Sequence, residues 1–140
     1  MTRELKMKKQ KTKGFHLIEI MIALAIISIL AAIALPSYLH HLVRAKRLEA
    51  ETQLTKLAIA MEKYHVENNS YQNASLAVLN FPDVVARGNY KLNITKASDN
   101  DYVLTANPIG KQAEDTCGQL LLYSNGDKKI TGDNAISKCW

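Results

Sequence analysis

The residue most informative about chemistry is a single carboxylate, Glu19, inside a long apolar run. Residues 15–35 read FHLIEIMIALAIISILAAIAL and contain no other side chain that is charged at neutral pH. As a helix this run would be about 31 Å long, enough to cross the ~30 Å hydrocarbon layer of a bilayer. A carboxylate in that layer costs a few kcal/mol and indicates a functional position. We expect Glu19 to pair with a cation; the alternative is an acid that reaches the headgroups and has no role.

The sequence contains two cysteines, Cys117 and Cys139. An even number of cysteines in a small domain outside the cytoplasm indicates a disulfide. A disulfide that closes the loop between Cys117 and Cys139 would stabilise the fold by roughly 3 kcal/mol. This contribution matters because the head is too small to bury a large core. Two free buried thiols are an alternative. A metal site is a weaker one, because no histidine lies between the cysteines and their spacing is not typical of ligands.

No motif for catalysis appears in the sequence. It has no glycine-rich phosphate loop, no nucleophile elbow and no zinc-binding His-Glu helix, so we predict no enzyme activity and no cofactor. His40 and His41 would point about 100° apart on a helix and are expected at the surface. His65 is expected at the edge of the core, and Glu114 and Asp115 are expected to be exposed loop acids.

Charge is concentrated at the N-terminus. Residues 1–14 contain six Lys and Arg and one Glu, whereas the remainder is balanced, so a general nucleic-acid surface is not indicated. A basic segment beside a span tends to stay in the cytoplasm and directs the following chain outward. A secretory signal has its small-residue cleavage site after the apolar region. Here Gly14 precedes that region, so cleavage there would remove the leader and keep the span.

A second helical segment, residues 36–68, follows the span. Pro36 lacks an amide donor, which predicts a kink or local unwinding of the helix there. The helix then continues with apolar residues at spacings of three, four and seven, as an amphipathic helix requires. These residues are Leu39, Leu42, Val43, Leu54, Leu57, Ala58, Met61, Tyr64 and His65. The outer face is expected to carry the charges of Arg47, Glu51, Glu62, Lys63 and Glu67.

The last segment, residues 69–140, predicts a small head. Residues 69–88 have no sustained period and are expected to form a loop with room for one short turn of helix. Four strands follow, and the Asn125-Gly126 pair predicts a hairpin between the last two. The strands are expected at residues 90–95, 101–107, 118–124 and 127–131. We therefore predict an α+β fold: a long N-terminal helix, transmembrane then amphipathic, packed on an antiparallel sheet with a C-terminal disulfide loop.

These patterns resemble a known family. The stretch KGFHLIEIMIALAIISILAAIALPSY is similar to the N-terminus of type IV pilins: a glycine, an aromatic residue, a glutamate four residues later, and about 20 apolar residues interrupted by proline. The stretch YVLTANPIGKQAEDTCGQL and the terminal CW resemble the head of PilE-type minor pilins. One departure is His16, which directly follows Phe15 at a position where the family usually has threonine. This departure bears on how efficiently the bond between Gly14 and Phe15 is cleaved.

The resemblance implies a processing and assembly route. A prepilin peptidase would cut between Gly14 and Phe15, Phe15 would be N-methylated, and an inner-membrane assembly platform would add the subunit to a fibre of pilin helices. Glu19 of an incoming subunit would pair with the Phe15 amine of the subunit already docked. The bacterial chain would begin as a single-pass inner-membrane protein with a periplasmic head and end in an extracellular pilus.

The resemblance leaves three functions open. The first is a minor pilin that helps to initiate the fibre or is incorporated into it. The second is a major pilin or a type II secretion pseudopilin; the cysteine pair argues against the pseudopilins whose heads use calcium instead. The third is a DNA or surface adhesin at the fibre tip, in which Lys128, Lys129 and Lys138 contact phosphates. A solvated face explains the same lysines.

Overall fold

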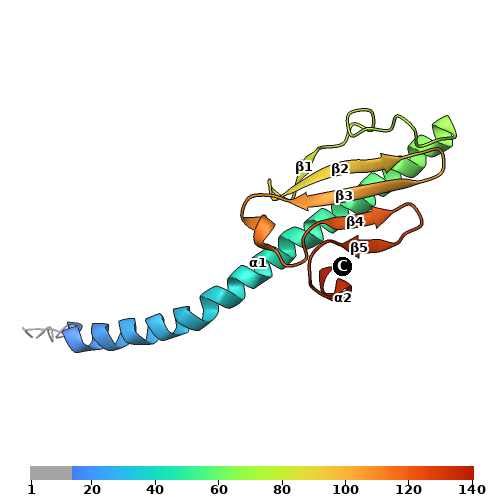
Figure 1. The fold of residues 1–140 in the computed structure, drawn as a ribbon. Coiled ribbons are helices and arrows are strands. Elements are labelled where there is room, and N and C mark those ends of the chain that lie inside the picture. Colours follow the sequence, from blue (N-terminus) through green and yellow to red (C-terminus); the bar gives the residue numbers. More distant parts are fainter. Residues whose placement is uncertain (1–13) are drawn as a thin grey trace, which may run out of the picture. The chain divides into compact units, whose positions relative to one another are not determined.

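The computed structural model describes residues 14–140 (Figure 1). The predicted leader, residues 1–14, lies outside this range except for Gly14. The described chain forms two units, one ending at Tyr38 and one comprising Leu39–Trp140. The elements, in chain order, are α1 (Leu17–Asn68), β1 (Val84–Val85), β2 (Tyr90–Ala97), β3 (Tyr102–Pro108), the 3-10 helix η1 (Gly110–Glu114), β4 (Leu120–Tyr123), β5 (Lys128–Ile130) and α2 (Ile136–Cys139).

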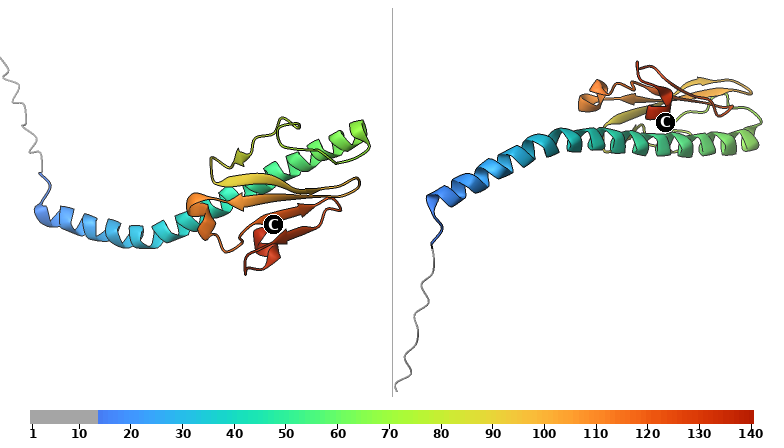
Figure 2. Two further views of the ribbon diagram at one scale, coloured as in Figure 1. Left: turned by 45° about the horizontal axis from the view of Figure 1, so that its top comes forward. Right: turned by 90° about the horizontal axis from the view of Figure 1, so that it is seen from below.

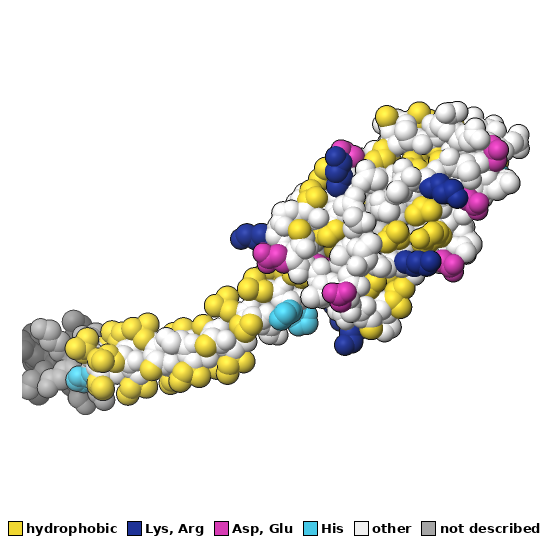
Figure 3. All heavy atoms as spheres, in the orientation of Figure 1, with side chains coloured by type: hydrophobic (Ala, Val, Ile, Leu, Met, Phe, Trp, Pro, Cys, Tyr) yellow, Lys and Arg dark blue, Asp and Glu magenta, His cyan; other side chains and the backbone are white. Residues whose placement is uncertain are grey.

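The first unit is the apolar half of α1. Its large apolar side chains are exposed within the single chain, and hydrophobic atoms cover the face drawn in Figure 3. Within residues 14–140, α1 is the one helix long and apolar enough to cross a membrane. The Ser28 hydroxyl donates to the Leu24 carbonyl (2.7 Å), which satisfies this polar group inside the helix. The helix continues through Pro36, and a kink there stays a prediction.

The second unit packs one antiparallel sheet, in the order β1-β2-β3-β4-β5, along α1 (Figures 1 and 2). The four expected strands are present. The sheet also contains a fifth strand, β1, in the segment expected to be a loop; it pairs Val84 with Lys91 and Val85 with Tyr90. Two residues are too short to produce a period-2 pattern, so β1 depends on the edge that β2 offers.

Alternation along the strands forms the core. Tyr90 and Leu92 of β2 are fully buried, as are Leu104 and Ala106 of β3. They face a stripe on α1 made of Ala50, Leu54, Leu57 and Met61, which recur at spacings of four and three. Full burial of each Leu or Met contributes about 1.5–3 kcal/mol. The predicted face formed by Tyr90, Leu92 and Ile94 is therefore confirmed.

The buried stripe on α1 begins later along the helix than the sequence predicted. Leu39 is 57% exposed and Leu42 37% exposed, whereas the first buried residue of the helix is Arg47. The predicted stripe was wrong for these two leucines, because the buried residues of α1 extend only from Arg47 to Met61. His65 is half-buried, as expected, and stacks on Tyr71 with 4.4 Å between ring centroids.

Candidate functional site

The first candidate site is the start of α1. Gly14 and Phe15 are exposed and precede the helix, which begins at Leu17, and the Phe15 side chain is 80% exposed. Glu19 lies in the first turn, where a negative charge is favoured by the helix dipole. Its side chain is exposed, and the ion pairs found within residues 14–140 do not include it. Glu19 is therefore available to a cation from outside the described chain.

A second site, which the sequence did not indicate, is a buried polar cluster in the head. Arg47 Nε donates to Asp115 Oδ2 at 2.8 Å, and Arg47 Nη2 donates to Asp115 Oδ1 at 2.7 Å. The Asp115 side chain is 1% exposed and that of Arg47 is 10% exposed. The Tyr90 hydroxyl (3.3 Å) and Gln112 Nε2 (3.3 Å) also donate to Asp115. Such a bidentate, charge-assisted pair is stronger than a neutral hydrogen bond.

Arg47 and Asp115 correct two predictions. Arg47 was expected on the outer face of the helix, but it lies one turn before Ala50 and continues the buried stripe. Asp115 was expected to be an exposed loop acid, but it follows η1, which turns the chain so that Gln112 and Asp115 face α1. Glu114 is exposed as expected. The helical spacing of Arg47 was the signal that could have revealed its burial.

Burial and charge set the pKa values in this cluster. Burial raises the pKa of Asp115, but the hydrogen bonds from Arg47 and from the Cys117 amide outweigh it, so the pKa is lower than usual. Burial raises the pKa of Tyr90 to about 12, and the neighbouring Asp115 charge adds to the rise. The cluster is thus an ionised Asp115 and Arg47 pair beside a neutral tyrosine, an arrangement suited to holding structure.

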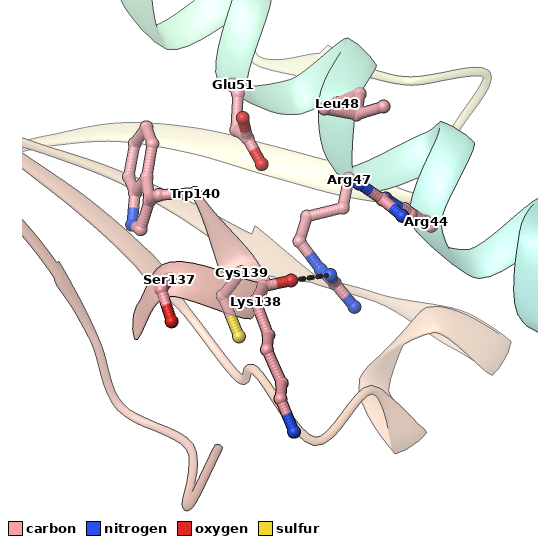
Figure 4. Close-up of a pocket in the computed structure, with 8 residues that line it drawn as sticks. All are labelled: Arg44, Arg47, Leu48, Glu51, Ser137, Lys138, Cys139 and Trp140. Carbon is pink, nitrogen blue, oxygen red and sulfur yellow. Dashed lines mark hydrogen bonds between the residues drawn. The ribbon is translucent and has the colours of Figure 1, made fainter. Parts of the chain in front are cut away.

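The predicted disulfide is present beside this cluster. Cys117 and Cys139 are joined, with 5.7 Å between their Cα atoms. Arg47 Nη1 donates to the Lys138 carbonyl at 3.1 Å, so the same guanidinium also contacts the C-terminal segment (Figure 4). The thiol and metal alternatives are thereby excluded for this pair.

A small cavity separates α1 from the C-terminal segment (Figure 4). Its volume is about 70 Å³, far below the ~300 Å³ of a small-molecule site. Glu51 points into it and is half-buried rather than on the outer face as expected. Burial raises the pKa of Glu51, an effect that three neighbouring cations partly offset.

The three lysines proposed to contact phosphates do not share one surface. Lys128 and Lys129 are adjacent in β5 and point to opposite faces of the sheet. The Lys128 ammonium lies 4.8 Å from the Trp140 ring centroid, on the α1 side, whereas the Lys129 ammonium lies 5.0 Å from the Tyr123 ring centroid. Lys138 belongs to α2 and lines the small cavity. The lysine patch as predicted was therefore wrong.

Metal ions in proteins are commonly held by groups of His, Cys, Asp or Glu side chains. In the region from residue 14 to residue 140, no group of three His, Cys, Asp or Glu side chains could hold a metal ion. His40 and His41 are exposed on α1, as expected.

Comparison with known proteins identifies the family to which this chain belongs. A model of the prokaryotic N-terminal methylation motif matches residues 9–35, and the model described as "Type IV minor pilin ComP, DNA uptake sequence receptor" matches residues 36–121. The chain belongs to the type IV pilin family. It is therefore a structural subunit of a bacterial type IV pilus, membrane-anchored and assembled with other pilin subunits.

Similar proteins include both major and minor pilins. The chain is 34% identical over 101 residues to the type IV wide pilus major component PilA4 of Thermus thermophilus, covering 72% of this pilin and 77% of PilA4. It is 36% identical over 83 residues to the major pilin PilA of Myxococcus xanthus, covering 59% of this pilin and only 38% of PilA. The fold is similar to that of the Neisseria meningitidis non-core minor pilin PilV, with a TM-score of 0.57, 22% identity, and coverage of 68% and 92%.

Proposed function

We propose that this pilin is a minor subunit that helps to initiate the pilus or is incorporated into it. The matched family model describes a minor pilin and spans residues 36–121, which supports the proposal. The similarity to major pilins makes a major subunit the alternative within the same family. Before assembly, the chain would be a single-pass inner-membrane protein with a periplasmic head.

Processing is proposed at the bond between Gly14 and Phe15. The support is the exposed, non-helical backbone at this bond and the methylation motif, which matches residues 9–35. A prepilin peptidase would remove residues 1–14 and expose an α-amino group on Phe15, which would then be methylated. The inner-membrane platform would receive the processed chain.

The proposed assembly contact rests on Glu19, the lone carboxylate of the apolar part of α1. Glu19 lies four residues after Phe15, in the first turn of α1, and would be about 6 Å from Phe15 along the axis if the helix extended to Phe15 in the processed chain. Cleavage would create a cation at Phe15, and both charges are costly in lipid when unpaired. Pairing Glu19 of an incoming subunit with the Phe15 amine of a docked subunit would remove both costs and favour the correct register.

The first test is mass spectrometry of pili sheared from cells that produce this pilin. We expect a peptide that begins with N-methylated Phe15, at low abundance relative to the other pilins. An abundance equal to that of the fibre's main subunit would contradict minor status. A processed chain that is absent from the fibres would also contradict incorporation and would place this pilin at the envelope.

The second test removes the negative charge of Glu19. Glu19→Ala should leave membrane insertion intact but sharply reduce incorporation into pili, measured by immunoblotting of sheared fibres against membranes. Ser28→Ala is the matched control, because Ser28 is a polar residue of the same helix whose hydroxyl bonds within the helix. Normal incorporation of the Glu19 variant would refute charge pairing.

A second candidate function is DNA binding by the head. The matched family model carries the description of a DNA uptake sequence receptor. On the face of the sheet opposite α1, Lys129 lies beside the Tyr123 ring, and bases stack on aromatic side chains while lysines contact phosphates. Lys129→Ala should weaken DNA binding by the full chain in detergent and reduce the salt slope by about 1, whereas the exposed Lys63→Ala control should not. Equal binding by both variants would exclude this face.

A further inference from the structure

One side chain, Arg47, contacts both segments that carry the cysteines. Its Nε and Nη2 atoms donate to Asp115, two residues before Cys117. Its Nη1 atom donates to the carbonyl of Lys138, the residue before Cys139 (Figure 4). Asp115 Oδ1 also accepts a hydrogen bond from the Cys117 amide at 3.2 Å. None of these bonds involves a sulfur atom.

Hydrogen bonds that do not involve the cysteine sulfurs hold the segment that carries Cys139 in its position. The hairpin of β4 and β5 returns the chain as far as Gly132, whose amide donates to the Cys117 carbonyl at 3.1 Å. Beyond Gly132, Asn134 Nδ2 donates to Thr116 Oγ1 at 3.1 Å and the Trp140 indole donates to the Lys129 carbonyl at 3.1 Å. The hydrogen bond from Arg47 to the Lys138 carbonyl ties this segment to α1. The hairpin thus closes most of the loop between the cysteines, and fixing the remaining residues from Gly132 to Cys139 beside Cys117 still costs conformational entropy.

We propose that Arg47 is a positioning residue for the disulfide: it docks the segment of Cys139 beside Cys117 before the cysteines are oxidised. The guanidinium suits this role because its planar fork can bond a carboxylate in two places while a third donor reaches a carbonyl. It is also held by a rigid element, since the next turns of α1 contribute Ala50 and Leu54 to the core. The disulfide then locks a segment that is already in place.

The oxidation itself needs a disulfide oxidant outside this chain, such as oxidised glutathione. One cysteine thiolate attacks the glutathione disulfide, forms a mixed disulfide and releases one glutathione thiolate. The second cysteine thiolate then displaces the other glutathione. Two electrons pass from the cysteines to glutathione, and the two cysteine protons are taken up through the solvent by the released thiolates. Arg47 acts in this sequence only by raising the effective concentration of one cysteine at the other.

The test uses Trp140, the only tryptophan of the chain, as the reporter. Its indole donates to the Lys129 carbonyl at 3.1 Å, and its side chain is partly buried. The full chain in detergent is reduced with a phosphine, and Trp140 emission and iodide quenching are recorded. In the native sequence we expect reduction to leave both nearly unchanged. In Arg47→Lys, reduction should shift the emission to the red and raise the quenching constant.

Arg47→Lys is chosen because it keeps the positive charge near Asp115 but replaces the fork by one ammonium group. Arg44→Lys is the matched control: Arg44 lines the same cavity and is exposed. Equilibration with glutathione buffers adds a second readout. The effective concentration of the two cysteines should fall about tenfold in Arg47→Lys, a change of about 1.4 kcal/mol, and should not change in Arg44→Lys.

The outcomes are decisive in both directions. Release of Trp140 on reduction of the native sequence, or equal effective concentrations in Arg47→Lys and the native sequence, would overturn the proposal. Circular dichroism checks that the reduced variant keeps its sheet. If the variant unfolds, the Cys139→Ser chain decides with Arg47 intact: a docked Trp140 supports the proposal, and an exposed one overturns it. No outcome here depends on pilus assembly.

Discussion

Replacing Arg47 by methionine should destabilise the head strongly. The change removes both bonds from Arg47 to an Asp115 side chain that is 1% exposed. Removing one partner of a buried ion pair costs about 3–5 kcal/mol, because the other charge is left buried. Tyr90, Gln112 and the Cys117 amide still donate to Asp115 at 3.2–3.3 Å. We therefore expect a loss of about 3 kcal/mol in the free energy of unfolding at pH 7, the lower end of that range.

The loss should depend on pH. In the native sequence the pKa of Asp115 is lowered in the folded state, so its contribution to stability is present above the unfolded pKa of about 3.9 and is lost as the pH falls through the lower folded value. Without Arg47, burial should raise the folded pKa of Asp115, so ionisation would destabilise the variant as the pH rises. The difference between the two chains should therefore be smaller near pH 4 than near pH 7, because the penalty in the variant is absent at pH 4 while the contribution of Asp115 in the native sequence is still largely present there.

The assay is urea unfolding of the full chain in detergent, followed by Trp140 emission and by the circular dichroism of the sheet at pH 4 to 7. Arg44→Met is the control; this exposed residue precedes Arg47 by one turn, and its replacement should change the free energy by less than about 0.5 kcal/mol. A loss below about 1 kcal/mol at pH 7 would refute the account of a buried pair. So would a loss of equal size at pH 4 and pH 7.

Three further predictions concern the disulfide region and the leader. Gly132→Ala should cost about 1–3 kcal/mol in urea unfolding, because a Cβ there would collide with the Thr116 carbonyl oxygen; a free energy of unfolding equal to that of the native sequence would contradict the clash. Cys139→Ser should lower the stability of the unreduced head by about 3 kcal/mol, and an unchanged urea midpoint would refute this loop-closure estimate. Gly14→Val should block processing, and intact-mass measurement should find residues 1–14 retained; a chain that begins at Phe15 would refute the assigned cleavage site.

Local patterns were sufficient for most of the fold. The apolar run with its single carboxylate, Glu19, is a property of consecutive residues, and so is the alternation of Tyr90, Leu92 and Ile94. Both repeat with the period of one element, so they predict a helix and a strand without knowledge of what packs against them. The helix that ends at Asn68 and the antiparallel sheet are confirmed for this reason.

The sequence by itself thus determined the apolar helix and the family, because each depends on residue types at short or simple spacings. It predicted the disulfide from the even number of cysteines, and the structure excluded the alternatives. Only the tertiary structure decided the roles of Arg47 and Asp115. These residues are 68 positions apart, and a charged side chain is stable in a core only when the fold supplies its partner. The same limit explains β1, which needs the edge of β2. The separation of Lys128 from Lys129 is different, because adjacent residues of any strand point to opposite faces and the predicted strand at residues 127–131 already implied it.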